Sequence, residues 1–161
     1  MVSVSSISGG VVLVVCAFLY GIEKGRIETK KLEMTEAMCA FVEYIGQQIE
    51  TFRTPLQRIY EEFSDERLEK EGFLNILRER GLLASLTQIK EKLPREAFCE
   101  MERFSNSLGA GYEKGQAELC SYTVKRLEKT AFEGRERLAQ RLRMYRLLPV
   151  LLALSLVILL L

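Results

Sequence analysis

The sequence predicts an all-α protein: a cytoplasmic helical bundle of about six helices, flanked by N- and C-terminal transmembrane helices. Three observations support this. Apolar residues between positions 23 and 146 recur at helical spacings, while the alternation typical of strands is nearly absent. Only three prolines interrupt the chain. All 23 Lys and Arg and all 22 Asp and Glu lie between Glu23 and Arg146, so both ends are uncharged.

Composition excludes several functional classes. A net charge of +1 argues against nucleic-acid binding driven by bulk positive charge. The chain has no histidine, which excludes Ser-His-Asp and Cys-His catalysis and histidine-ligated metals. Its four cysteines are widely spaced and form no Cys-x-x-Cys pair. We therefore predict no enzyme, no cofactor, no metal site and no nucleic-acid partner.

Residues 1–22 are predicted to be an N-terminal transmembrane anchor. Val2 to Ile22 is an uncharged run whose helix would span about 31 Å, close to the thickness of a bilayer core. A cleaved signal peptide is one alternative, but the first six residues lack the Lys or Arg that begins such peptides. A buried core helix is the other.

Residues 147–161 are predicted to be the C-terminal transmembrane anchor. As a helix this leucine-rich segment reaches only about 22 Å, but a start at Met144 lengthens it if Arg146 extends back to the headgroups. A buried core helix is the alternative. Such a helix normally carries a polar stripe, and Ser155 is the only polar side chain here.

The orientation of both anchors follows from the charges beside them. Lys and Arg gather on the inner flanks and are absent from the outer ones, which places the central domain, residues 23–146, in the cytoplasm. Binding of a specific anionic lipid is an alternative explanation of the arginine cluster. The basic residues that set the topology are Lys24, Arg26, Lys30, Lys31, Arg135, Arg137, Arg141, Arg143 and Arg146.

Helical stripes and helix-end signals divide the central domain. The first stripe runs from Met38 to Phe52, and its helix is expected to continue from the N-terminal anchor. Thr54 is predicted to be an N-cap, with Pro55 at the first helical position. The further helices are expected at 55–63, from Ser64-Asp65 to Arg80 with Gly81 as cap, at 82–93, at 95–108, and from before Cys120 through Tyr145 into the second anchor.

Three groups of residues are candidates for chemical sites. The glycine-rich stretch 109–115 lacks both the preceding strand of a dinucleotide site and the Walker pattern, so it is interpreted as an interhelical turn. Cys39 and Cys120 are interpreted as small core residues and Cys16 as a membrane residue. The acidic residues are attributed to solvated helix faces: Glu61, Glu62, Glu100 and Glu102.

Two local motifs carry a family resemblance. One is Ile49-Glu-Thr-Phe-Arg-Thr-Pro-Leu56, and the other is Phe104-Ser-Asn-Ser-Leu-Gly109 with Gln116 seven residues later. With the N-terminal anchor, the helical middle and the short leucine-rich end, the chain resembles the stage III sporulation protein AB family over nearly its whole length. Family members are similar to the cytoplasmic domains of type II secretion and type IV pilus platform proteins.

The resemblance implies a non-enzymatic platform subunit of a secretion-like channel complex between mother cell and forespore. It would sit in the outer forespore membrane, with its body in the mother-cell cytoplasm. Its implied partners are membrane lipids, other membrane subunits of the complex and a companion cytoplasmic secretion-type ATPase. The alternative is a membrane-anchored helical adaptor or signalling protein with no ATPase partner.

Partner contact is expected at two interhelical turns, because binding residues concentrate on exposed loops held by a rigid scaffold. The competing interpretation is that these residues only start and end helices. The candidate contact residues are Thr54, Pro55, Leu108, Gly109, Glu113, Lys114 and Gln116.

Overall fold

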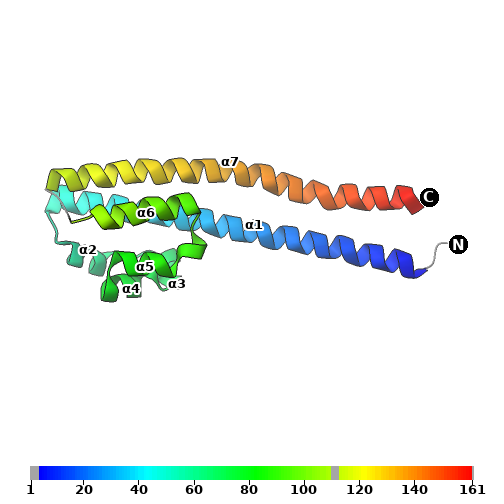
Figure 1. Ribbon diagram of the computed structural model, residues 1–161, viewed down its shortest axis with the longest axis horizontal. Coiled ribbons are helices and arrows are strands. Elements are labelled where there is room, and N and C mark those ends of the chain that lie inside the picture. The colour runs from blue at the N-terminus through cyan, green and yellow to red at the C-terminus, as the bar shows by residue number, and fades with distance from the viewer. Residues whose placement is uncertain (1–3, 110–112, 161) are drawn as a thin grey trace. The chain divides into compact units, whose positions relative to one another are not determined.

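The computed structural model describes the backbone of residues 4–109 and 113–160. Within these ranges, the side chains of residues 4–14, 17–18, 113–114, 142, 145–150, 152–154 and 156–160 are not described. All regular structure in the described ranges is helical, which confirms the all-α class (Figure 1). The elements are α1 (Val4–Gln47), the π-helix η1 (Gln48–Phe52), α2 (Leu56–Glu62), α3 (Glu66–Lys70), α4 (Phe73–Arg80), α5 (Leu82–Gln88), the 3-10 helix η2 (Lys90–Lys92), α6 (Arg95–Ser107) and α7 (Glu113–Leu160).

The chain divides into two compact units. The end unit consists of Met1–Thr29 and Arg135–Leu161, and the body unit is Lys30–Gly134. Both α1 and α7 contribute residues to each unit, as expected for a bundle whose first and last helices run on into the terminal segments. The short helices α2 to α6 belong to the body unit alone.

The core of the body unit is built around Phe41 on α1. Its ring packs edge-on against Phe63, with 5.0 Å between ring centres, and against Phe73 on α4 at 5.7 Å. Edge-to-face geometry is a preferred arrangement for aromatic rings. The predicted stripe on α1 is buried from Met38 to Ile49.

The last member of that stripe, Phe52, was predicted wrongly. It is 68% exposed rather than buried. The reason is the π-helix η1, whose wider i→i+5 turn adds a residue per turn and rotates position 52 away from the apolar face.

One predicted helix is broken in two. The expected start at Ser64-Asp65 is confirmed, because the Asp65 carboxylate accepts hydrogen bonds from the backbone N–H groups of Arg67 and Leu68. The expected continuation to Arg80 is wrong, because Gly72 adopts a left-handed conformation with φ of +74° and separates α3 from α4. This extra break accounts for seven α-helices in the described ranges instead of about six.

Two further helix boundaries followed from glycine and proline. Gly81 ends α4 as predicted, its N–H bonding to the Leu77 carbonyl. The segment expected as one helix over 82–93 is α5 followed by the 3-10 turn η2. Leu93 is extended because the proline ring that follows disfavours helical backbone before it.

Helix α7 crosses α1 closely within the body unit. A Cβ placed on Gly46 would lie 3.0 Å from the Cβ of Cys120, and one on Gly134 would lie 3.5 Å from a methyl group of Leu32. The two contacts show that these parts of α1 and α7 run antiparallel. The predicted seam of α7 is buried at Cys120, Leu127 and Ala131 and partly buried at Val124, Gly134 and Leu138, while the side chains of its last two members, Leu142 and Tyr145, lie outside the described residues.

The end unit shows apolar side chains on its surface. Gly21 and Gly25, four residues apart on α1, are buried. The exposed large apolar residues of this unit are Val15, Leu19, Tyr20, Ile22, Ile27, Met144 and Leu151.

Within the described residues, no helix offers a stretch both long and apolar enough to cross a membrane. This finding does not support the flanking transmembrane helices. The predicted anchors, 1–22 and 147–161, consist mostly of residues whose side chains are not described, and they stay predictions.

Candidate protein-contact surface

The turn after α1 is an unusual piece of backbone. Arg53 has φ of +50°, a left-handed conformation that is uncommon for a residue with a side chain. Gln48 holds the turn, because its carbonyl accepts from the N–H groups of Arg53 and Thr54 and its side-chain oxygen accepts from the Thr54 hydroxyl at 3.2 Å. π-Helices and left-handed residues both concentrate at functional sites, where surrounding contacts maintain a strained conformation.

The predicted role of Thr54 as N-cap is wrong. Pro55 is the capping residue of α2, with extended backbone, and its carbonyl accepts from the N–H groups of Arg58 and Ile59 at 3.0 and 3.2 Å. The helix begins at Leu56, so Thr54 lies one residue before the capping position, and its hydroxyl donates to Gln48 in the preceding turn. The Thr-Pro pair therefore links η1 to α2.

The turn between α6 and α7 is held by Gln116. Helix α6 ends with the Leu108 N–H bonded to the Phe104 carbonyl, and Gly109 follows with φ of +84°. The Gly109 N–H then donates to the Gln116 side-chain oxygen at 2.9 Å, and Gln116 is only 8% exposed. The seven-residue spacing from Gly109 to Gln116 thus has a structural reason, because the bond ties the chain just after α6 to α7, and this favours a structural role over partner contact for Gln116.

The two turns meet at one end of the body unit. A Cβ placed on Gly109 would lie 3.7 Å from a methyl group of Leu56, the residue after Pro55. Leu56 and Leu108 are both partly buried against the core. The structure thus brings together the two segments that the sequence selected, although 53 residues separate Leu56 from Gly109.

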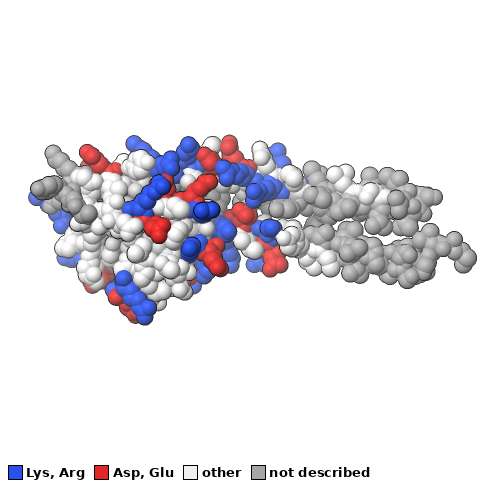
Figure 2. Space-filling view, viewed as in Figure 1, with Lys and Arg blue, Asp and Glu red and all other residues white. Residues whose placement is uncertain are grey.

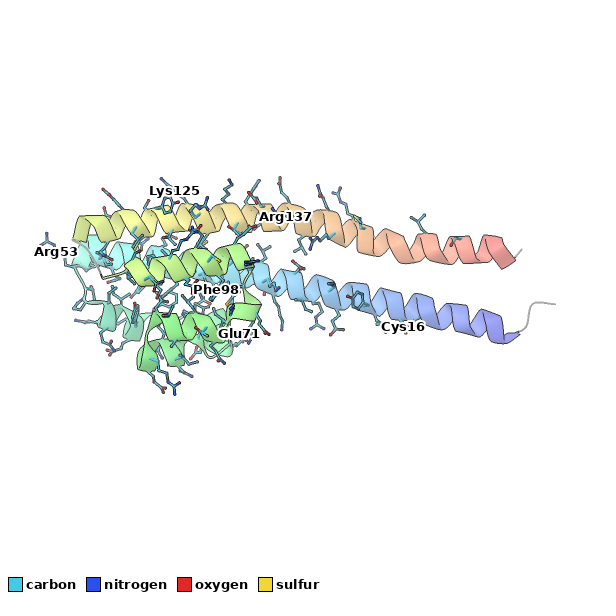
Figure 3. All side chains as sticks on the ribbon, viewed as in Figure 1. Cys16, Arg53, Glu71, Phe98, Lys125 and Arg137 are labelled. Atoms are coloured by element: carbon cyan, nitrogen blue, oxygen red, sulfur yellow. The ribbon has the colours of Figure 1, made fainter. Side chains whose placement is uncertain are left out.

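We call this end of the body unit the bundle-end surface, defined by Phe52, Arg53, Pro55 and Gly109. All four residues are exposed. Figure 3 shows Arg53 extending from the end of the helices. The predicted contact residues Glu113 and Lys114 have side chains outside the described residues.

Two of the basic residues that were predicted to set the topology, Lys24 and Arg141, contact neighbours within the end unit. The Lys24 amine donates to the Tyr20 hydroxyl at 3.2 Å and lies 5.4 Å from the centre of its ring. An ion pair of 3.6 Å joins Arg141 to Glu28 within the end unit. The side chain of Arg146 is not described, and the remaining residues of the set are exposed or partly buried.

A groove of about 410 Å³ lies between α6 and α7 in the body unit. Its central group is Glu100, whose side chain is only 10% exposed. One carboxylate oxygen accepts from the Arg126 Nη2 at 2.9 Å and Nε at 3.3 Å, and from the Arg103 Nη1 at 3.3 Å. Hydrogen bonds and charge attraction from Glu100 raise the pKa of Arg126. Figure 2 shows basic and acidic side chains intermixed over this part of the molecule.

The prediction that Glu100 lies on a solvated face is wrong, whereas Glu61, Glu62 and Glu102 are exposed as expected. Glu100 falls three residues after Ala97 and four before Phe104, both buried, so it shares their face of α6. This spacing was visible in the sequence. It was missed because acidic residues are rarely buried unless they are paired.

A second groove, of about 290 Å³, lies between α1 and α7 in the body unit. Gly46, Ala117, Cys120 and Val124 line it, together with the exposed polar residues Glu43, Gln47, Glu50, Ser121, Lys125 and Glu128. Burial raises the pKa of the Cys120 thiol to about 11, so it stays protonated and inert at neutral pH.

In the part of the chain that the structure describes, no group of three or more cysteine and acidic side chains is arranged to hold a metal ion. Residues 110–112 of the glycine-rich stretch 109–115, which was predicted to be an interhelical turn, lie outside the described residues.

Comparison with known proteins identifies one family. The family model of stage III sporulation protein AB matches residues 83–161. The predicted resemblance is thereby confirmed over α6, α7 and the second motif, Phe104–Gln116, while the first motif lies before the matched region. No curated protein and no solved structure matches the chain.

Proposed function

We propose that this chain, whose residues 83–161 belong to the stage III sporulation protein AB family, is a non-enzymatic platform subunit of a sporulation membrane complex. The family makes it a sporulation-stage protein. The finer role is that it anchors to the outer forespore membrane through both ends and docks a cytoplasmic secretion-type ATPase. The channel between mother cell and forespore would contain it beside other membrane subunits.

The observation that supports this role is that the two motifs which carry the resemblance, one of them within the matched residues, meet at the bundle-end surface. Docking residues are often exposed aromatic or arginine side chains held on a rigid support. Phe52 and Arg53 have these properties, and the hydrogen bonds of Gln48 hold their turn. The chain has no phosphate-binding loop of the Walker form, so it would couple to an ATPase rather than hydrolyse ATP itself.

The membrane part of the proposal rests on the sequence. The apolar ends carry no charge, and the basic residues lie only on their inner flanks. Reporter cysteines at Ser3 and Leu161, in a chain without its native cysteines, should react with an impermeant thiol reagent from the non-cytoplasmic side. Protection of both positions would contradict this topology, and protection of Leu161 alone would mean that the short C-terminal segment does not cross.

The ATPase part is tested by affinity capture of the secretion-type ATPase from sporulating cells with the detergent-solubilised full chain. Phe52→Ala should lower retention of the ATPase about tenfold, the effect of losing roughly 1.4 kcal/mol of binding free energy. Phe132→Ala is the matched control, since Phe132 is 59% exposed on α7 away from the bundle-end surface. Retention that both variants leave unchanged, or the absence of any ATPase, would favour the adaptor role instead.

A further inference from the structure

The α1–α7 groove has a floor of small or apolar side chains. Gly46 lets the two helices approach so closely that an added Cβ would lie 3.0 Å from Cys120. Ala117 and Val124 continue this floor along α7, and both are only partly buried. Two antiparallel helices that approach over small residues leave a furrow along their axes, which is the shape that the ridge of a third helix fills.

The rim of the groove is acidic. Glu43 on α1 and Glu50 on η1 lie along one side and Glu128 on α7 lies along the other, and Lys125 is the only basic residue among the described residues that line the groove. None of the three carboxylates forms an ion pair with any side chain that the structure describes. The described residues that line the groove thus present three exposed negative charges against one positive charge.

We propose that the α1–α7 groove docks a basic helix of a partner protein. The helix would place small side chains against Gly46 and Ala117, and Lys or Arg at spacings of three and four would reach the rim carboxylates. Glu43 on α1 and Glu50 on η1 both line the groove, so cations spaced along one edge of the incoming helix would face them. This is a helix-in-groove interaction with charge selection at the rim.

This surface differs from the bundle-end surface, so the inference holds whether or not an ATPase binds at Phe52. The test uses the full chain in sporulating cells, with an uncharged diazirine-bearing lysine analogue at the exposed rim position Gln47. After irradiation, the cross-linked peptide is identified by mass spectrometry. We expect a segment of another protein with helical periodicity and several Lys or Arg on one side.

Charge reversal then tests the rim. Glu43→Lys with Glu128→Lys should lower the cross-link yield at least fivefold, on the scale of losing about 1 kcal/mol. Lys125→Glu should instead raise the cross-link yield. A variant that merely failed to fold would not raise it. The matched control is Glu79→Lys with Glu102→Lys, which makes the same change in net charge at exposed positions outside the groove and should leave the yield within twofold.

Several results would overturn the proposal. These are a cross-link to a second copy of this chain, a cross-link to lipid or to an acidic segment, the absence of any cross-link, and a yield that the groove and control reversals change equally. Replacing the captured Lys or Arg by Glu should restore cross-linking in the Glu43→Lys, Glu128→Lys variant. Failure of that rescue would show that the charges do not meet.

Discussion

The two grooves beside α7 in the body unit use their carboxylates in opposite ways. In the α6–α7 groove, the nearly buried Glu100 accepts hydrogen bonds from Arg103 and Arg126. In the α1–α7 groove, Glu43 and Glu128 are exposed and form no ion pair with the described side chains. A buried carboxylate requires such partners, whereas an exposed one is solvated and remains available.

The carboxylates beside two neighbouring faces of α7 therefore have different roles: one stabilises the fold and the others are available to bind a partner. The ion pair between Glu100 and Arg126 links α6 to α7, so its removal should lower the free energy of unfolding. The acidic rim contributes little to the free energy of unfolding, so its removal should weaken partner binding without destabilising the fold. Measurements of the free energy of unfolding on the detergent-solubilised full chain can test this contrast.

The largest effect is expected from Leu127→Asp. Leu127 is fully buried on α7 between residues that line the two grooves, so the variant places an unpaired charge in the seam that both share. We expect destabilisation by about 3–5 kcal/mol, measured by urea unfolding followed by circular dichroism. A melting temperature within a degree or two of the wild type would show that the seam is not core.

A smaller effect is expected from Glu100→Gln. The amide keeps an acceptor oxygen but loses the charge that Arg126 and Arg103 contact, which should cost about 1–2 kcal/mol in the same assay. Glu128→Gln is the matched change on the other side of α7 and should stay within about 0.5 kcal/mol. Equal effects of the two variants would remove the contrast between the grooves.

The helical class and most helix ends could be predicted from sequence, because local signals determine them. The stripe from Met38 to Ile49, the Asp65 cap and the Gly81 stop each follow from residue type and spacing within a few positions. The predicted helix ends were wrong where the same residue type is compatible with more than one backbone conformation. A glycine such as Gly72 can lie inside a helix or end one. Only its left-handed backbone in the structure shows that it ends one here.

The candidate site was predictable in part for a related reason. The sequence selected Thr54-Pro55 and Leu108-Gly109 as turns, but that Leu56 lies beside Gly109 depends on tertiary packing. The π-helix that exposes Phe52 and the hydrogen bond from Gly109 to Gln116 likewise could be recognised only in the folded structure. The α1–α7 groove joins residues about 70 positions apart, which no periodicity reveals.

The floor of the α1–α7 groove can be tested through its glycine. Gly46→Ala gains helix propensity but brings a Cβ to 3.0 Å from that of Cys120, an atom fixed to the backbone of α7, so the helices must separate. We expect a net loss of about 1 kcal/mol, since overpacking outweighs the propensity gain. Gly115→Ala is the control, because nothing lies within 4 Å of its Cβ position, and it should be neutral or stabilising.

The smallest effect concerns a third kind of carboxylate, one that serves only its own helix. Asp65 accepts from the N–H groups of Arg67 and Leu68 and from the Arg67 guanidinium, and the hydrogen bond with the Arg67 side chain is the main cause that lowers its pKa. Asp65→Asn keeps a good N-cap but removes the charge, so the loss at pH 7 should be only about 0.5 kcal/mol.

The pH dependence of that loss identifies its cause. Because folding lowers the pKa of Asp65, its contribution is complete above the unfolded value of about 3.9 and disappears as the pH falls through the lower folded value. The stability difference between wild type and Asp65→Asn should therefore be constant from pH 7 to about pH 5 and shrink toward zero near pH 2. Urea unfolding at these pH values measures it, with Glu69→Gln as an exposed control on the same helix. A difference that persists undiminished at pH 2 would mean that cap geometry, rather than the charge on Asp65, stabilises the start of α3.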